Sequence, residues 1–338
     1  MSERDGVVSS PWRNRIRRVH VWLGFALLLP LSLVAFSGAG LSFAQQADRV
    51  IAPELWTISP PSNVEPVPLA RIIEIIERRL PGMQLERLDL PERRQDTAVA
   101  QLIDGEGEQR QVFVDPFREV IVGERLASAD PRHWLGSVHR KLSAGRAGQA
   151  VVIAASTGVI VLLVLGWVGR RYRQGGDGAR RWHRRLVWLG ASLWSVCALT
   201  AVFALAAGHS LNDNHPPPAV KAGTADTLAG ACEGRSIDTI WWRDDGRAVV
   251  RCRAPGSFGP FGVGYDAGHG AQSGAGIAAW LTAVHTGEVF GVGGRVLWFW
   301  GTLLLPLAMW FGLIAFWHRR RIERGGAVGS PTTEGETE

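Results

Sequence analysis

Cysteine, lysine and charge are scarce in this chain of 338 residues. None of its three cysteines belongs to a Cys-x-x-Cys pair, which excludes a zinc ribbon or a thioredoxin-type redox motif. Only 20% of the residues are charged, and only Lys141 and Lys221 are lysines. The sequence also lacks a P-loop, a zinc-protease motif and a nucleophilic triad. The glycine-rich stretch at 291–294 follows no strand pattern, so it is no dinucleotide fingerprint.

Apolar residues are abundant and are gathered into four long runs. A helix needs about 20 residues to cross roughly 30 Å of hydrocarbon, and each run reaches that length. Fifteen tryptophans, many at the ends of these runs, are typical of membrane interfaces. A signal peptide is the alternative for the first run, but about 25 apolar residues exceed its usual core of about 7–15. The sequence therefore predicts a membrane α-helical protein with a four-helix transmembrane bundle. The runs are 19–43, 147–168, 186–207 and 296–317.

Arginine clusters indicate the direction of the helices. They precede the first run, fill the loop between the second and third, and follow the fourth. If the helices alternate, all three clusters lie on one side, which the positive-inside rule makes the cytoplasm. Arg132, Arg140, Lys141 and Arg146 count against this, but they follow a long segment, where the rule is weaker. The clusters are Arg13, Arg15, Arg17 and Arg18; Arg170, Arg171, Arg173, Arg180, Arg181, Arg184 and Arg185; and Arg319, Arg320, Arg321 and Arg324.

This topology divides the chain into nine segments and places both termini in the cytoplasm. Because the arginines lie beside apolar runs, topology explains them and no nucleic-acid partner is expected. The membrane segments with their flanking turns are 17–46, 133–170, 181–209 and 285–318, the second including leading helical turns. The cytoplasmic segments are the basic N-terminus 1–16, the basic loop 171–180 and the tail 319–338; the external segments are 47–132 and 210–284.

The first external segment carries the pattern of a small α+β unit. Residues 67–82 repeat apolar side chains with the period of a helix and end at Pro81-Gly82. Residues 97–103 and 109–116 are predicted strands joined by a turn at 104–107, and 118–126 is a further candidate strand. We expect a helix packed on a small antiparallel sheet.

The second external segment is predicted to contain a β-hairpin. Two strand patterns, 236–243 and 248–253, flank Asp244-Asp245-Gly246, a strong hairpin signal. Cys232 precedes the hairpin and Cys252 lies on its second strand. A disulfide between them is plausible in an oxidising compartment. Two unpaired thiols are the alternative.

Each apolar run is led by one histidine: His20, His139, His183 or His285. Alternating helices place His20 and His183 near the cytoplasmic face, and His139 and His285 near the other. Haem iron takes axial ligands from opposite sides, and helices of a bundle can project such side chains inward. We therefore predict two bis-histidine b haems, with these four imidazoles as the iron ligands. A polar side chain that reaches interfacial water is the alternative for each, and His318 is the rival of His183.

The chain resembles the PepSY-associated transmembrane family over about residues 15–320. The resemblance rests on VFVDPFREVIVGE at 112–124, on the motifs HVWLG, VHRKL and VHTGEVFGVGGR at 20–24, 138–142 and 284–295, and on four spans with a basic tail. Two features depart from the family pattern. The glycine of the third span follows His183 by seven residues rather than four, and PFREV replaces the more usual Asp-Pro-x-Thr-Gly.

The resemblance implies a periplasmic PepSY-like module, with the hairpin segment as a second, smaller insertion. It also implies a bacterial inner-membrane ferrisiderophore reductase with two b haems. The acceptor would be a ferric siderophore or another periplasmic molecule. The donor would be quinol or a cytoplasmic molecule, because no flavin or nicotinamide domain is visible in the sequence. A non-enzymatic PepSY scaffold or peptide-binding protein is the rival. A metal-ion transporter ranks third, because the apolar runs contain no Asp or Glu.

Further side chains are predicted to support the haems. Arg140, Arg146 and Arg295 have no topological explanation, so they are candidates to bind haem propionates. Gly24 and Gly190 lie on the same helix faces as His20 and His183 and would leave room for a flat ring. Arg18 and Arg184 are better explained by topology. His209 is a possible additional imidazole near the periplasmic haem, whereas solvated positions are expected for His133, His215 and His269.

Overall fold

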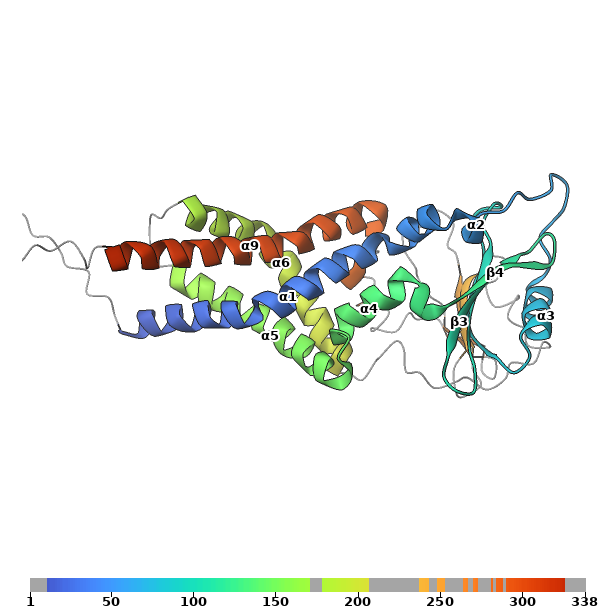
Figure 1. Cartoon of the computed structure of the whole chain (residues 1–338), viewed down its shortest axis with the longest axis horizontal. Helices are drawn as coiled ribbons and strands as arrows, with labels where there is room; N and C mark the ends of the chain where they lie inside the picture. Colours follow the sequence, from blue (N-terminus) through green and yellow to red (C-terminus); the bar gives the residue numbers. More distant parts are fainter. Residues whose placement is uncertain are drawn as a thin grey trace, which may run out of the picture. The chain divides into compact units, whose positions relative to one another are not determined.

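Four helices of the chain are long and apolar enough to cross a membrane (Figure 1). They are α1 (Pro11–Ile51), α5 (Gly145–Arg170), α6 (Gly178–Ala206) and α9 (Gly291–Gly325). The predicted fold class, a membrane helical protein with a β-containing module, is confirmed. The structure is a computed structural model that describes residues 11–170, 178–206, 237–242, 248–252, 264–266, 270–272, 281, 284–287 and 290–325.

The chain divides into two compact units. The helical unit contains Met1–Phe36, His139–Leu199 and Trp300–Glu338, and the sheet unit contains Ser37–Val138 and Thr200–Phe299. The core of the helical unit takes residues from all four long helices. Small side chains at its centre, such as Ala155 and Ala308, allow helix backbones to approach closely.

Prolines interrupt hydrogen bonding inside two of the long helices. Pro30 lies in α1 and Pro306 lies in α9, where neither nitrogen can donate. One turn before Pro306, the Gly301 carbonyl accepts a hydrogen bond of 2.9 Å from the indole nitrogen of Trp194. Trp194 itself is buried in the core of the helical unit. This hydrogen bond joins α6 to α9 close to the proline.

The sheet unit is built around a six-stranded antiparallel sheet of strand order β4-β3-β2-β1-β5-β6. Helix α3 (Leu69–Arg79) lies against one face, where Ile72, Ile73 and Ile76 join the core (Figure 1). Helix α2 (Pro53–Trp56) covers the other face, where Trp56 packs edge-on against Phe113. The strands are β1 (Gln84–Asp89), β2 (Ala98–Ile103), β3 (Gln109–Asp115), β4 (Val120–Leu126), β5 (Ile237–Trp242) and β6 (Ala248–Cys252).

The predicted helix and strands of the first external segment are confirmed as α3, β2, β3 and β4. The turn between β2 and β3 forms because the Asp104 carboxylate accepts hydrogen bonds from the backbone of Glu106 and Glu108. A second aspartate, Asp115, turns the chain after β3 by accepting from the backbone of Phe117 and Arg118. This Asp-Pro turn is the structural content of the family motif.

Strand β1 was not predicted, because its buried side chains do not alternate. Leu85 and Leu88 are both buried although they lie three residues apart. A β-bulge between Leu85 and Arg87 shifts the pairing register with β2 and turns both leucines to one face. The period of two on which strand prediction depends is therefore interrupted.

The predicted hairpin is confirmed as β5 and β6, and it extends the same sheet. β5 pairs with β1, with Leu88 opposite Ile240, so two segments far apart in the sequence share one core. A separate two-stranded sheet is formed by β7 (Gly264–Asp266) and β8 (Gly270–Gln272). Helix α4 (Pro131–Lys141) follows β4 after the 3-10 turn η1 (Ala127–Ala129) and leads into α5.

Candidate functional site

The structure brings His20 and His183 together in the helical unit. His20 lies on α1 and His183 near the start of α6, and their ring centroids are 6.4 Å apart with the ring planes at 83°. Both rings are half-buried. These are the two histidines that topology predicts at one depth of the bundle.

Each ring of this pair lies against a glycine of a neighbouring helix. His20 Cε1 lies 3.4 Å from the position that a Cβ would take on Gly166 of α5. His183 Nδ1 lies 3.1 Å from the equivalent position on Gly312 of α9. A Cβ at Gly312 would press on the His183 ring, whereas a Cβ at Gly166 would make an ordinary van der Waals contact with His20. Gly312 therefore keeps open part of the space that the His183 ring occupies, and Gly166 leaves room for a close helix–ring approach.

Each imidazole also lies close to the backbone of the residue four positions before the neighbouring glycine. That residue is Leu162 for His20 and Ala308 for His183. His183 Nδ1 donates a hydrogen bond of 2.7 Å to the Ala308 carbonyl. The backbone of Leu162 lies near the ring of His20. Within the described part of the chain, however, His20 Nδ1 is buried and makes no hydrogen bond of normal geometry. A buried polar nitrogen of this kind is uncommon unless a bound group satisfies it.

The separation of the two rings can be compared with that expected for two imidazoles that share one iron. Two imidazoles that bind one metal ion from opposite sides, each through a bond of about 2 Å, hold their ring centroids about 6 Å apart. The observed separation of 6.4 Å is close to that value. No group of three or more His, Cys, Asp or Glu that could hold a metal ion occurs among the described residues. Two imidazoles suit a metal whose remaining ligands come from a macrocycle.

His139 is oriented by the backbone of α1. Its Nδ1 donates a hydrogen bond of 2.9 Å to the Val34 carbonyl, which leaves Nε2 with the lone pair in the neutral ring. The neutral imidazole is the form that binds metals.

His285 is oriented by a side chain of α6. Its Nδ1 lies 2.8 Å from the Thr200 hydroxyl, so the same ring nitrogen is engaged as in His139 and His183. Metal-binding histidines usually hold their second nitrogen in such a bond, which fixes the tautomer and the ring plane. His139 belongs to the helical unit and His285 to the sheet unit, so their pairing stays a prediction from the sequence.

The three arginines proposed to bind propionates have no acidic partner in the described part of the chain. Arg140 and Arg146 are exposed around the junction of α4 and α5, and Arg295 is half-buried in the first turns of α9. Other arginines of the chain are paired with acidic side chains. Arg125, for example, is paired with Asp48, which is itself 2% exposed. Guanidinium groups without a carboxylate partner remain available to an external acid group.

The other predicted positions are less informative. His318 and His133 are exposed on α9 and α4. Gly24 faces open space, whereas the space beside Gly190 is filled by the Trp194 indole, so the expectation that Gly190 makes room for a flat ring is wrong. His209, His215, His269, Cys232 and the side chain of Cys252 lie outside the described residues.

Sequence reasoning missed the residues that position the rings: Gly166, Gly312, Ala308, Val34 and Thr200. Their roles depend on contacts between helices, because the carbonyl or glycine belongs to a different helix from the histidine. One signal was available. Gly166 follows His139, and Gly312 follows His285, by the same number of residues.

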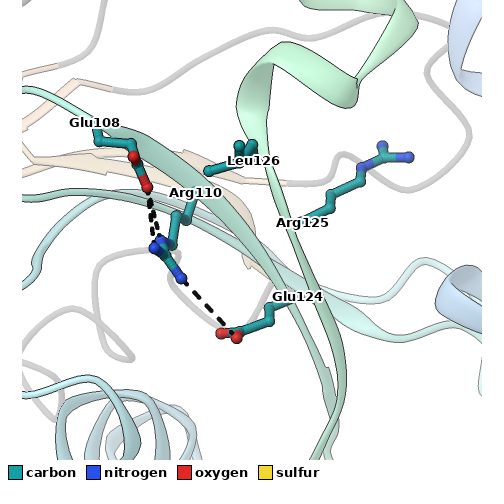
Figure 2. A pocket seen from close by; sticks show the side chains of 5 residues that line it. All are labelled: Glu108, Arg110, Glu124, Arg125 and Leu126. Carbon is teal, nitrogen blue, oxygen red and sulfur yellow. Dashed lines mark hydrogen bonds and ion pairs between the residues drawn. The ribbon is translucent and has the colours of Figure 1, made fainter.

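The sheet unit carries a shallow pocket of about 350 Å³ at the edge formed by β3 and β4. Figure 2 shows Arg110 between Glu108 and Glu124, while Arg125 points away from them. Arg110 lies 3.0 Å from Glu108 and 4.0 Å from Glu124, so the charges of the lining neutralise one another. The pocket contains no imidazole, thiol or hydroxyl nucleophile and is not a candidate for redox chemistry.

The geometry can now be compared with known proteins. The family model described as "PepSY-associated TM region" matches residues 17–319. The match covers nearly the whole chain, including all four histidines that lead the apolar runs. A search of curated proteins gave no match. Together with the four long apolar helices, the family match shows a multi-pass membrane protein.

Proposed function

The chain belongs to the PepSY-associated TM region family, and from that premise we propose that it is a di-haem b-type oxidoreductase of a bacterial inner membrane. In this proposal it passes electrons from quinol or a cytoplasmic donor to a periplasmic acceptor, a ferric siderophore. Each ferric ion takes up one electron and becomes ferrous, while the donor is oxidised. Both termini lie in the cytoplasm.

One observation carries the proposal: the paired imidazoles of His20 and His183, with ring centroids 6.4 Å apart. A lone interfacial histidine needs no partner ring, and two neutral imidazoles gain little from an edge contact in a helix core. The separation suits a metal between them. The hydrogen bond from His183 to Ala308 and the glycines beside both rings favour imidazoles held in fixed positions as ligands. They do not favour the alternative, in which each side chain extends to interfacial water.

The residues of the chain orient and shield the site. Haem supplies the one-electron redox chemistry when it is bound. The Ala308 and Val34 carbonyls hold Nδ1–H of His183 and His139, which directs Nε2 of each ring toward a ligand. Ala308, whose carbonyl accepts from His183, belongs to the apolar core of the helical unit. Arg140, Arg146 and Arg295 would be available to the propionates of a second haem, for which the sequence predicts His139 and His285 as ligands.

The experiment is a reduced-minus-oxidised spectrum of the purified protein, with haem and protein quantified. We expect b-type bands and two haems per chain. His20→Ala and His183→Ala should each lower the ratio to one. His318→Ala, a change at an exposed histidine on α9, is the matched control and should keep two. Absence of b-type bands after haem-replete expression would favour the PepSY scaffold instead. Loss of one haem in His318→Ala would show that His318, and not His183, is the second ligand of the haem bound by His20.

A ferric-chelate assay tests the reaction itself. Membrane vesicles that contain the protein, reduced with a quinol analogue, should convert a trihydroxamate ferric chelate to ferrous iron trapped by a ferrous-specific dye. His183→Ala should abolish the rate and His318→Ala should leave it unchanged. Haem reduction without iron reduction would retain the electron-transfer proposal and exclude that chelate as the acceptor.

A further inference from the structure

The chain contains the same histidine–glycine spacing twice. His139 is followed by glycine six, nine and 27 residues later, at Gly145, Gly148 and Gly166. His285 is followed by glycine at the same three distances, at Gly291, Gly294 and Gly312. Each histidine is also preceded by valine, Val138 or Val284. Glycine is common in membrane helices, so the spacing acquires meaning only if both copies build the same structure.

The first two glycines of each copy build the same turn. The residue six after the histidine begins a long helix with positive φ, 58° at Gly145 and 62° at Gly291. A Cβ on Gly148 would overlap the Lys141 carbonyl oxygen, and a Cβ on Gly294 would overlap that of Gly287. Both carbonyls lie two residues after the histidine. The turn therefore requires glycine at both places in both copies.

A backbone hydrogen bond repeats in the two turns. The carbonyl two residues after the histidine accepts from the amide three residues further on. The bond joins Ala144 N to Lys141 O at 2.8 Å in the first copy, and Phe290 N to Gly287 O at 3.2 Å in the second. The match thus extends from the glycines to the backbone that they admit. Among the described residues, the two copies share these glycines and this hydrogen bond, and they differ two residues after the histidine, where φ is positive at Gly287 but not at Lys141.

The third glycine of each copy lies beside an imidazole of another helix. Gly166 contacts His20, and Gly312 contacts His183. Eighteen residues separate the second and third glycines, which is five turns of α-helix, so both face the same side. In α5 this distance is about 27 Å, close to the thickness of a bilayer core. One face of each copy can thus serve an imidazole near either side of the membrane.

We infer that Gly166 and Gly312 are positioning residues for the proposed haem, and that the chain is a duplicated His–Gly element in which each copy positions one ring of the His20–His183 pair. The inference rests on the proposed function for the identity of the ligand. The ring positions themselves do not depend on it. Gly312 acts by letting the His183 ring reach the Ala308 carbonyl, one turn earlier on the same helix face.

The test compares Gly312→Ala and Gly166→Ala with two controls. Gly293→Ala on α9 and Gly169→Ala on α5 add the same methyl group where it would meet nothing within 4 Å. The readouts are the midpoint potential and the low-spin ferric EPR signal of the haem, in addition to haem content. We expect Gly312→Ala to shift the EPR g values of one of two haems, and Gly166→Ala to shift them less, because its methyl group would make an ordinary van der Waals contact with His20. Gly312→Leu should lower the ratio to one. The controls should match the unsubstituted protein.

A second arm uses haem-free protein, so that failure of the proposed function stays distinguishable. The 15N shifts of labelled histidine, with His183 assigned from His183→Gln, report which ring nitrogen carries the proton. We expect Nδ1–H in the unsubstituted protein and in Gly293→Ala, and its loss in Gly312→Ala. An unsubstituted protein without b-type bands would overturn the haem while this arm still tests the positioning. If all four alanine variants match the unsubstituted protein in both arms, the inference is wrong.

Discussion

At the scale of single residues, the ring nitrogens are the most informative atoms of the molecule. Nδ1 is engaged in His139, His183 and His285, by Val34, Ala308 and Thr200 in turn. The backbone carbonyls fix the Nδ1–H tautomer of His139 and His183, whereas the Thr200 hydroxyl can donate to or accept from His285. In His139 and His183 this leaves the Nε2 lone pair available for ligation, as in metal-binding histidines.

His183 also illustrates a contact that cannot be predicted from the sequence. Its glycine, Gly190, follows by seven residues, and the structure shows that the Trp194 indole fills that space. The ring instead uses Gly312 of α9, so the altered spacing within α6 does not prevent its contact with His20. Motif spacing within one helix reports the helix face of a side chain. It does not report which neighbouring helix receives the ring.

A buried ion pair offers a prediction at this scale. Asp48, near the end of α1, accepts hydrogen bonds from Arg125 of β4 and from the indole nitrogen of Trp56. Asp48→Asn removes the charge opposite a guanidinium whose side chain is 13% exposed. Because breaking one partner of a buried pair leaves the other uncompensated, we expect local stability to fall by about 3 kcal/mol. Faster amide hydrogen exchange in β4 and α2 measures the change.

The control for Asp48→Asn is Glu108→Gln at the edge of the same sheet. Glu108 pairs with Arg110 in the shallow pocket of Figure 2, where both side chains are well exposed. Exposed pairs contribute about 0–1 kcal/mol, so exchange should change little. If both substitutions accelerated hydrogen exchange equally, the buried Asp48–Arg125 pair would contribute no more to stability than the exposed Glu108–Arg110 pair.

At the scale of elements, the sequence predicted the helices and strands whose apolar pattern depends on their own chain segment alone. The apolar period of α3 and the alternation of β2 and β3 arise from burial of one face, which the sequence records directly. In β1 the β-bulge interrupts the alternation of buried and exposed residues, so the sequence does not predict this strand. The pairing of β5 with β1 was also out of reach, because about 150 residues separate the two strands. Long-range partners are chosen by complementary faces, and many strands present similar apolar faces.

The shared core of β1 and β5 can be tested by Ile240→Ala. Ile240 lies opposite Leu88 and is fully buried with α3 residues such as Ile76. Truncation of a buried isoleucine leaves a cavity, so we expect a loss of about 2–5 kcal/mol. If β5 belongs to the sheet, hydrogen exchange should accelerate in β1 and α3 as well as in β5.

The matched control is Val122→Ala on the edge strand β4, where the valine is 37% exposed. It should have a smaller effect, because more of the Val122 side chain stays in contact with water than of Ile240, which is fully buried. Acceleration confined to β5 and β6 after Ile240→Ala would mean that the hairpin folds independently of β1. That result would restore the interpretation of the second external segment as a separate insertion.

At the scale of the whole molecule, the two His–Gly copies suggest how one chain makes two similar sites. Each copy begins with its own histidine and carries, 27 residues later, a glycine that lies beside another histidine. If the copies act alike, His139 and His285 share one haem as His20 and His183 share the other. The pairing of His139 with His285 rests on topology and on this repetition, and double substitutions test it directly.

Haem stoichiometry distinguishes ligands of the same haem from ligands of different haems. His139→Ala and His285→Ala should each leave one haem per chain, because the remaining imidazole cannot hold the iron from both sides. The double variant of these two should still keep one haem, since both changes remove the same site. His139→Ala combined with His183→Ala should keep none. His133→Ala, at an exposed position of α4 six residues earlier, is the control and should keep two. If the His139/His285 double variant lost both haems, the two histidines would belong to different sites and the pairing by depth would be refuted.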